Sequence, residues 1–251
     1  MLIMGIDTSD HRGYEEKSRT DSLLLATFNQ DNKSIKLLSI PRDLYAYVPY
    51  IGDYTKINHA HFHGGPTAAV ETVENLFDIP VDYYMRVDFE GFLEVIDTIG
   101  GIHFDVPYEF YESDSTDKKN SIHLLPGYQK VNGEEALALA RTRKHDSDIE
   151  RGKRQQEIIK KVFEEVTSIK SVTKVSKLID VAGNNMNTNL SFSEIKDLTA
   201  YALDKDLDIQ TLNFDGDGWI MDDGLWYFHA NENSKEEIEK ELKEHLEIET
   251  D

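Results

Sequence analysis

A short apolar run at residues 22–28, Ser-Leu-Leu-Leu-Ala-Thr-Phe, most constrains what this chain can fold into. Its side chains are apolar almost without alternation, which is typical of a strand that is buried on both faces. Further apolar runs at 2–6 and 34–40 predict two more strands, and the run at 34–40 forms a hairpin with 22–28 across a turn at 29–33. The N-terminal part of the chain therefore predicts a sheet with 22–28 as a central strand.

Helical and extended patterns alternate after this sheet. Apolar stripes predict helices at 66–78, 90–99, 149–169, about 171–183 and 193–204, and strands at 83–89, 102–106 and 207–214. Pro66 stands at the first position of the first helix, where proline is favoured. A polar segment at 109–121 predicts a mobile loop. Because neither an internal repeat nor a linker is visible, we predict one α/β domain over residues 1–251.

Composition excludes several classes of function. The 251 residues carry a formal net charge of -21, which opposes general nucleic-acid binding, since that needs a basic face. The chain has no cysteine, and hence neither a disulfide framework nor a cysteine nucleophile. It contains no Gly-x-Ser-x-Gly elbow, Walker loop or dinucleotide fingerprint. No run of 18 apolar residues is present, so the sequence predicts no membrane span.

The arginines are concentrated in residues 141–156. Half of the arginines of the chain lie there, and none follows Arg154. Guanidinium groups grip phosphate or carboxylate with a planar fork that is always charged, so the stretch predicts an anion site. The alternative is the start of a helix whose arginines pair with Asp146, Asp148 and Glu150.

Charged residues also follow or precede the predicted strands, where a sheet usually presents functional groups. Asp7 follows the first strand, Arg19 and Asp21 precede the second, and Arg42 follows the third. Two aspartates held by adjacent strands could bind Mg²⁺ together with phosphate oxygens, or they could be ordinary turn and cap residues. The arginines could clamp a phosphoryl group, or they could be unrelated surface ion pairs.

Two other patterns resemble metal sites. His59, His61 and His63 would line one face of a strand, which permits a metal site, although a polar segment at a pocket rim is the simpler interpretation. Residues 215–218, Asp-Gly-Asp-Gly, resemble the start of a calcium loop but lack its glutamate at the twelfth position, where Trp226 stands. We interpret that segment as a turn.

Taken together and in order, the motifs resemble those of the LytR-CpsA-Psr family. The resemblance covers roughly residues 3–165. The matching pieces are Gly5-Ile-Asp7, Arg19-Thr-Asp-Ser22, Ser39-Ile-Pro-Arg-Asp43, Lys56-Ile-Asn58, Gly64-Gly65, Val87-Asp-Phe-Glu-Gly-Phe92, Gly100-Gly101, Leu125-Pro-Gly127, Asn132-Gly133, Ala140-Arg-Thr-Arg143 and Asp148-x-x-Arg-x-x-Arg-Gln155.

The resemblance implies a fold with a central mixed sheet flanked by helices and an apolar tunnel for a lipid. It implies an enzyme of Gram-positive bacteria that acts at the extracellular face of the cell membrane, through an N-terminal cytoplasmic tail and a single-pass anchor that this chain lacks. The expected activity is that of a phosphotransferase of the peptidoglycan ligase type. It would transfer an anionic glycopolymer, of the wall teichoic acid or capsule type, from a polyprenyl-diphosphate carrier to a sugar hydroxyl of peptidoglycan. No nucleic acid is expected as a partner.

The same resemblance implies roles by position. Asp7 and Asp21 would bind Mg²⁺, or Mn²⁺ in its place. The residues expected to hold phosphate oxygens are Arg42, Arg141, Arg143 and Arg151. Those expected to line the site are Arg19, Lys56, Asn58 and Gln155. Asp148 would either act as a base toward the acceptor hydroxyl or orient the arginines.

This chain departs from the family pattern at two places. Ser9 stands where the family often has an arginine, and Arg12 comes later, which leaves the role of Arg12 open. Ser147 and Glu150 replace glycines that often surround the Asp148 motif. Two alternatives to an enzyme remain: a protein that binds the polyprenyl lipid without turning it over, and a transcriptional attenuator. The net charge and the lack of a helix-turn-helix signature oppose the attenuator.

Overall fold

The computed structural model describes residues 1–6, 18–144, 148–168, 172–204 and 206–248. These residues form two compact units. The first unit comprises the described residues of 1–86 and 208–248, and the second comprises those of Val87–Leu207. Asp7 and Arg12 lie outside the described residues, so their predicted roles stay predictions. Among the described residues, no helix is both long and apolar enough to cross a membrane.

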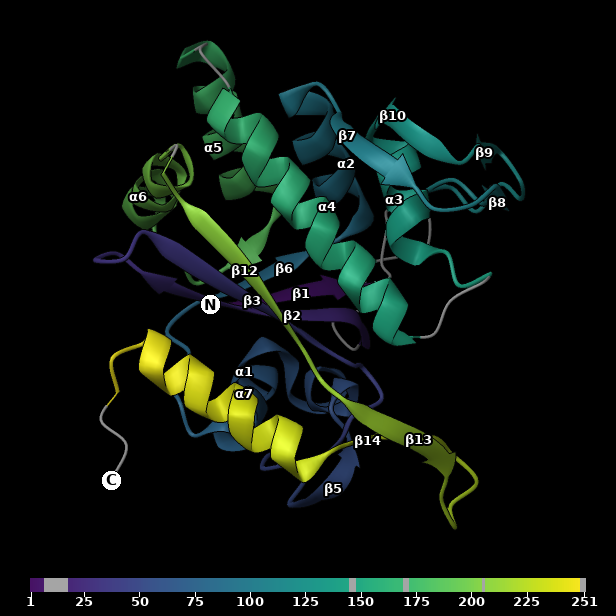
Figure 1. Ribbon diagram of the computed structural model, residues 1–251, viewed down its shortest axis with the longest axis vertical. Helices are drawn as coiled ribbons and strands as arrows, with labels where there is room; N and C mark the ends of the chain where they lie inside the picture. Colours follow the sequence, from purple (N-terminus) through teal and green to yellow (C-terminus); the bar gives the residue numbers. More distant parts are fainter. Residues whose placement is uncertain (7–17, 145–147, 169–171, 205, 249–251) are drawn as a thin grey trace. The chain divides into compact units, whose positions relative to one another are not determined.

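The first unit is built on a mixed sheet (Figure 1). Its order is β6-β1-β2-β3-β12. The strands are β1 (Leu2–Ile6), β2 (Thr20–Asn29), β3 (Ser34–Ile40), β6 (Tyr84–Val87) and β12 (Asp208–Asn213). β2 pairs with β1 and β3 in antiparallel fashion, whereas β12 runs parallel to β3. The predicted central mixed sheet is therefore confirmed, with β2 and its neighbours as expected.

Burial explains why β2 lacks alternation. Leu23, Leu24, Leu25 and Ala26 are consecutive, so their side chains point to alternate faces, yet all of them are buried. Helices α1 (Asn58–Phe77) and α7 (Glu232–His245) both contact β2. The predicted α/β fold with flanking helices is thus confirmed.

Helix α1 bends where Gly65 leaves helical geometry, with φ 69° and ψ -160°. A side chain is strained at a positive φ of this kind, and Pro66 then restarts the helix with a fixed φ. The prediction of a helix from Pro66 is confirmed for this second segment. The prediction that the three histidines line a strand is wrong, because the chain is already helical from Asn58.

Two hairpins complete the first unit. β4 (Tyr45–Val48) pairs with β5 (Asp53–Lys56), and β13 (Gly216–Ile220) pairs with β14 (Trp226–Ala230). The interpretation of residues 215–218 as a turn is wrong, because β13 already begins at Gly216. Its glycines are needed there, since a Cβ on Gly216 would lie 2.2 Å from the backbone oxygen of His229.

The second unit packs helices against two short two-stranded sheets. Its helices are α2 (Phe89–Ile99), α3 (Gly133–Arg141), α4 (Asp148–Ser168), α5 (Val172–Asn185) and α6 (Phe192–Ala202). Its strands are β7 (Ile102–Val106), β8 (Phe110–Glu112), β9 (Ile122–Leu124), β10 (Gly127–Val131) and β11 (Asn187–Thr188). Ile96, Ile102, Leu139 and Ile158 lie in one apolar core. The interpretation of 109–121 as a mobile loop is wrong at Phe110–Glu112, which forms β8 and pairs with β9.

A buried histidine fastens the end of α7 to the sheet. The His245 ring lies 2.7 Å from the hydroxyl of Thr27 and 2.9 Å from that of Ser34. Burial lowers the pKa of His245 below its ordinary value, and the nearby charge of Lys36 lowers it further. The folded protein therefore favours the neutral ring.

We expect the stabilisation by His245 to be full above about pH 6.5, the ordinary histidine pKa, and to decline below it, because the unfolded chain then takes up the proton first. His245→Gln is expected to lower the free energy of unfolding by about 1–3 kcal/mol at pH 7.5, since two hydrogen bonds are lost. Urea titrations at pH 7.5 and 5.5 should show a smaller loss at pH 5.5. An equal or larger loss at pH 5.5 would contradict this assignment. The control is His123→Gln at exposed β9, which should cost under about 1 kcal/mol at either pH.

Candidate functional site

Strand register brings a carboxylate and a guanidinium group together in the first unit. Leu23 of β2 pairs with Ile40 of β3, so the start of one strand lies beside the end of the other. Asp21 therefore meets Arg42, and the two form a short hydrogen-bonded ion pair. Both side chains remain partly exposed, at 39% for Asp21 and 24% for Arg42. Asp21 and Arg42, which the sequence placed at neighbouring strand ends, therefore lie side by side.

A second carboxylate holds Arg42 from its other side. Asp43 is buried, and its carboxylate lies 2.8 Å from Nζ of Lys56 and 3.4 Å from Nε of Arg42. The backbone N–H of Asn58 donates to the carbonyl of Arg42 at 3.2 Å. Lys56 and Asn58, predicted to line the site, therefore lie beside Arg42. Asp43 is a positioning residue, and its only sequence signal was its place in the Pro-Arg-Asp motif.

The start of α1 adds polar groups to this site. Arg19 lies over the ring of Phe62, with 5.6 Å between its guanidinium carbon and the ring centroid. Burial lowers the pKa of His59, and the positive charges of Arg19, His63 and Lys56 lower it further. His61 is fully buried, and its Nδ1 lies 2.7 Å from the carbonyl oxygen of Ser18. His61 thereby anchors the backbone just before Arg19, a role that its spacing in the sequence did not reveal.

These contacts leave an excess of positive charge. Arg42 and Lys56 pair with Asp21 and Asp43, and Arg19 adds a positive charge near His59, in a protein whose net charge is -21. In addition, the buried Oδ1 of Asn58 and Nε2 of His61 have no hydrogen-bond partner among the described residues. Buried polar atoms normally have partners, so these two have hydrogen-bonding capacity for a bound water, ion or ligand. This group, named the Arg42 cluster, comprises Arg19, Asp21, Arg42, Asp43, Lys56 and Asn58.

The Mg²⁺ prediction concerns Asp7 and Asp21. Among the described residues, no group of three or more His, Cys, Asp or Glu side chains could hold a metal ion by itself. A partly exposed Asp21 carboxylate still fits the way Mg²⁺ binds beside phosphates, with one or two carboxylates and the remaining ligands from substrate and water. Since Asp7 lies outside the described residues, the metal site stays a prediction.

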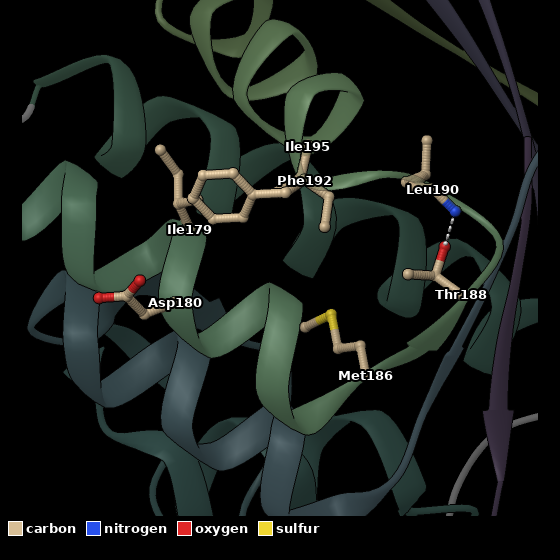
Figure 2. A pocket seen from close by; sticks show the side chains of 7 residues that line it. All are labelled: Ile179, Asp180, Met186, Thr188, Leu190, Phe192 and Ile195. Atoms are coloured by element: carbon tan, nitrogen blue, oxygen red, sulfur yellow. Dashed lines mark hydrogen bonds between the residues drawn. The ribbon is translucent and has the colours of Figure 1, made fainter.

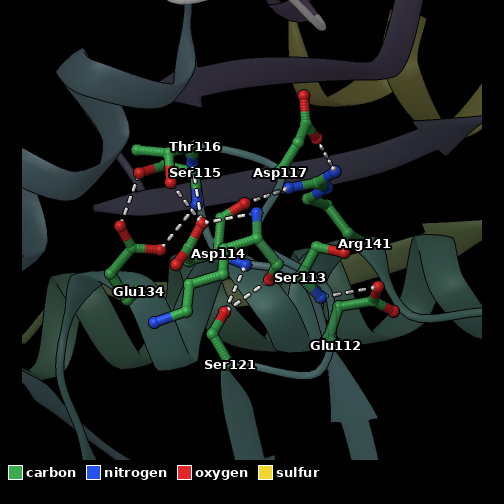
Figure 3. Close-up of polar contacts among 10 residues, drawn as sticks. Glu112, Ser113, Asp114, Ser115, Thr116, Asp117, Ser121, Glu134 and Arg141 are labelled. Atoms are coloured by element: carbon green, nitrogen blue, oxygen red, sulfur yellow. Dashed lines mark hydrogen bonds and ion pairs between the residues drawn. The ribbon is translucent and has the colours of Figure 1, made fainter.

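The second unit presents Arg141 at the end of α3 (Figure 3). Its guanidinium lies over Phe89, 4.7 Å from the ring centroid. Nη1 lies 3.5 Å from the carbonyl oxygen of Asp114, and Nη2 lies 3.8 Å from the Asp117 carboxylate. These long contacts leave most of the hydrogen-bonding capacity of Arg141 available to a stronger anion.

The segment between β8 and β9 that touches Arg141 is held by its own side chains. The carboxylate of Asp114 accepts hydrogen bonds from the hydroxyl of Thr116 at 2.7 Å and from the N–H of Lys118 at 3.0 Å. These bonds, the Thr116 hydroxyl first, lower the pKa of Asp114. Ser115 bonds to Glu134 at the start of α3. The segment therefore has a fixed turn geometry around Arg141 (Figure 3).

Two side chains of α4 fasten the end of α3. Buried Arg154 donates from Nε to the carbonyl of Leu139 and from Nη2 to that of Thr142, both at 2.6 Å. Gln155 donates to the carbonyl of Ala140 at 3.1 Å. The last carbonyls of a helix lack partners within it, and a cation there also complements the helix dipole. Arg154 and Gln155 thus position Arg141, and the predicted substrate contact of Gln155 stays a prediction.

The remaining predicted residues of the arginine stretch are placed differently. Arg151 is buried in α4, whereas Arg143 is exposed just after α3. Asp148 begins α4, but its side chain lies outside the described residues. The predicted residues therefore form two groups, the Arg42 cluster in the first unit and the arginines around Arg141 in the second. Joint action of the two groups on one phosphate stays a prediction.

The second unit also contains a pocket between α5 and α6, with a volume of about 230 Å³ (Figure 2). Figure 2 shows Ile179 and Met186 from one side and Phe192 and Ile195 from the other. The predicted lipid tunnel stays a prediction.

Comparison with known proteins identifies the family. The sequence matches the LytR_cpsA_psr family over residues 1–244. The chain belongs to the LytR-CpsA-Psr family. It is 43% identical over 252 residues to an uncharacterised protein of Staphylococcus aureus, and 37% identical over 259 residues to the Bacillus subtilis polyisoprenyl-teichoic acid–peptidoglycan teichoic acid transferase TagV. These matches cover 99% and 100% of this chain, but 62% and 65% of the relatives. The chain thus spans somewhat under two thirds of their length.

The fold agrees with this family. A structure of TagT, a LytR-CpsA-Psr protein of Bacillus subtilis, contains bound octaprenyl pyrophosphate. It has a TM-score of 0.76 and 31% sequence identity, and the match covers 98% of this chain and 89% of that one. The resemblance drawn from the motifs is therefore confirmed.

We expect Arg154→Ala to destabilise the folded protein. The substitution removes the buried guanidinium and leaves the carbonyls of Leu139 and Thr142 without its hydrogen bonds. The free energy of unfolding in urea should fall by about 2–4 kcal/mol. The matched control is the adjacent Lys153→Ala, which removes only an exposed pair with Glu150 and should cost under about 1 kcal/mol. Equal costs for the two variants would refute a structural role for Arg154.

Proposed function

We propose that this chain transfers an anionic glycopolymer from a polyprenyl-diphosphate carrier to a sugar hydroxyl of peptidoglycan. The observation that carries the proposal is the Arg42 cluster, which gathers positive charge and the unmatched buried Oδ1 of Asn58 in a strongly acidic protein. Two relatives support the choice of substrate. TagV is named as a teichoic acid transferase to peptidoglycan, and TagT contains octaprenyl pyrophosphate.

The proposed reaction is a phosphoryl transfer. The acceptor hydroxyl oxygen bonds to the phosphorus next to the glycopolymer, while the bond from this phosphorus to the bridging oxygen breaks. Polyprenyl phosphate leaves with that oxygen and its electron pair, and the hydroxyl proton passes to a base. Asp148 is proposed either as this base or as a residue that orients the arginines.

The chain's cations supply the catalysis in this proposal. Charge spreads over the non-bridging oxygens as the phosphoryl group moves, and fixed guanidinium groups stabilise it. Arg42 is held by Asp21 and Asp43 before substrate arrives, so little reorganisation is needed. Arg141, Arg143 and Arg151 are proposed as further phosphate contacts. Asp7 and Asp21 are proposed to hold Mg²⁺, which would neutralise charge on the diphosphate.

The place of action is proposed on the same grounds. Peptidoglycan and its lipid-linked precursors meet at the outer face of the cell membrane, so we propose that this domain works there in a Gram-positive bacterium, tethered by an anchor. The anionic polymer could be wall teichoic acid or a capsule polymer.

We expect Arg42→Ala to lower kcat by about a hundred- to a thousand-fold, as loss of one transition-state contact commonly does. Arg42→Lys should recover only part of the rate, because ammonium lacks the planar fork. The assay mixes purified protein, Mg²⁺, a lipid-diphosphate-linked oligosaccharide and peptidoglycan oligomers, and measures release of polyprenyl phosphate with joined product. Lys153→Ala is the control with unchanged activity.

Two further measurements test the metal site and the choice between an enzyme and a lipid-binding protein. Asp21→Asn should raise the Mg²⁺ concentration needed for half-maximal rate, and chelation should abolish turnover. Tight lipid binding without turnover across several acceptors would instead show a lipid-binding protein that is not an enzyme.

A further inference from the structure

Two hairpins of the first unit join into one surface beside the Arg42 cluster. Leu44, just before β4, forms a parallel bridge with Phe228 of β14. The backbone N–H of Phe228 donates to the carbonyl of Asp43 at 2.9 Å. The β4–β5 and β13–β14 hairpins are therefore fixed relative to each other and to the residue next to Arg42.

A continuous row of rings crosses this surface. Tyr47 contacts Tyr54, and Tyr54 contacts Tyr45, each with 5.4 Å between ring centroids. Tyr45 contacts His229 at 5.1 Å, and His229 stacks on Trp219 at 3.7 Å with an angle of 5° between the rings. We name these five residues the aromatic strip.

Three rings of the strip are exposed, and the other two, Tyr45 and His229, are half-buried. Tyr54 is 56% exposed and Trp219 is 51% exposed, although aromatic rings of this size are usually buried. The same hairpins carry further exposed apolar side chains: Tyr50, Ile51, Ile220, Leu225 and Trp226. Ile220 and Trp226 pair with each other on the face of β13–β14 opposite to Trp219. A continuous row of partly exposed rings marks an interaction surface, unlike single scattered apolar residues.

The β13–β14 hairpin that carries Trp219 and His229 is also fixed before any partner binds. The Trp226 ring lies so close over Gly218 that a Cβ there would come within 2.0 Å of it. The hydroxyl of Tyr227 donates to Asp223 at 2.6 Å, which fixes the turn between β13 and β14. A rigid surface loses little entropy on binding, so it favours recognition.

The charge around the strip narrows the class of partner. Residues 45–55 and 215–230 contain no lysine or arginine, whereas Asp53, Asp217 and Asp222 are exposed on them. Burial lowers the pKa of His229, so that ring is neutral as well. Surfaces that bind anionic membranes carry lysine and arginine, and carboxylates would repel an anionic glycopolymer. A neutral partner with flat C–H faces and hydroxyl donors fits both the rings and the carboxylates.

One end of the strip adjoins the candidate reaction site. Lys56 lies over the ring of Tyr227, 5.5 Å from its centroid, while the same Nζ bonds to Asp43 beside Arg42. Tyr227 in turn packs edge-on against Tyr45 of the strip. A chain lying along the strip therefore ends next to the cations proposed to hold the phosphates.

We propose that the aromatic strip binds the neutral glycan chain of the peptidoglycan acceptor, with sugar rings stacked on Tyr54 and Trp219 and hydroxyls donating to the nearby aspartates. This assignment rests on the proposed transferase function. It gives acceptor and donor separate sites: the acidic strip takes the neutral glycan, and the Arg42 cluster takes the anionic diphosphate.

The first experiment measures binding without turnover, using a neutral N-acetylglucosamine oligomer and calorimetry. Trp219→Ala and Tyr54→Ala should each weaken binding by about tenfold, in line with the loss of one stacking contact. Trp219→Phe should restore most of the affinity, because it keeps a ring. The matched control is Tyr128→Ala, which removes an exposed ring of the second unit and should leave binding unchanged. Far-UV circular dichroism and urea titration check that each variant folds.

The second experiment uses the transferase assay. Trp219→Ala should raise KM for the peptidoglycan oligomer about tenfold and leave kcat and KM for the lipid donor unchanged. If Trp219→Ala turns over with an unaltered KM for the acceptor and binds the oligomer as before, the proposed role of the strip is refuted. The proposed transferase function would still stand. If the protein shows no turnover but binds the oligomer in a way that depends on Trp219, the glycan site is supported. The proposed transferase function is then refuted.

Other occupants give different results. Binding of anionic phospholipid vesicles that Trp219→Ala abolishes, without an effect on oligomer binding, would make the strip a membrane contact and overturn the proposal. A dimer in sedimentation that the same variant dissociates would make it a self-association surface, with the same consequence.

Discussion

The ion pair between Asp21 and Arg42 is the interaction on which the candidate site depends. It exists because β2 and β3 are antiparallel, with Leu23 opposite Ile40, so that a residue at the start of β2 meets a residue just after the end of β3. In a hairpin the turn sets the register, and the short connection between Asn29 and Ser34 holds β2 and β3 in this pairing. The pairing of two buried strands therefore sets the position of a cation just outside them.

For the binding of an anion, the charge close to the site matters more than the net charge of this protein. A net charge of -21 repels anions at long range, but salt screens that repulsion beyond about 8–10 Å. The Arg42 cluster acts inside this distance, where buried Asp43 and Lys56 fix its geometry. The acidic surroundings then serve selectivity: an anion is held only where cations are assembled, and the aromatic strip is left to neutral partners.

The sequence predicted what depends on local pattern. Continuous apolar runs located β1, β2 and β3, and the order of the motifs located the family. It did not predict the helical histidine segment, because a glycine pair before Pro66 resembles a boundary, whereas Gly65 only bends α1. Nor did it predict that Gly216 begins a strand, since the need for glycine there comes from the His229 backbone of a strand met later in the chain. The spacing and composition of the sequence do not reveal such packing constraints.

The arginine stretch illustrates the same limit for function. Arg141 and Arg154 are the same residue type in one short stretch. Arg154 is buried against the carbonyls of Leu139 and Thr142, whereas the polar contacts of Arg141 with the described residues are long. The difference follows from helix ends, because the last carbonyls of α3 need donors and α4 supplies them. Arg154 is therefore buried and committed to the backbone of α3, so it is not placed to meet a ligand. Its neighbour can face an anion because the helix end that carries it is already fixed.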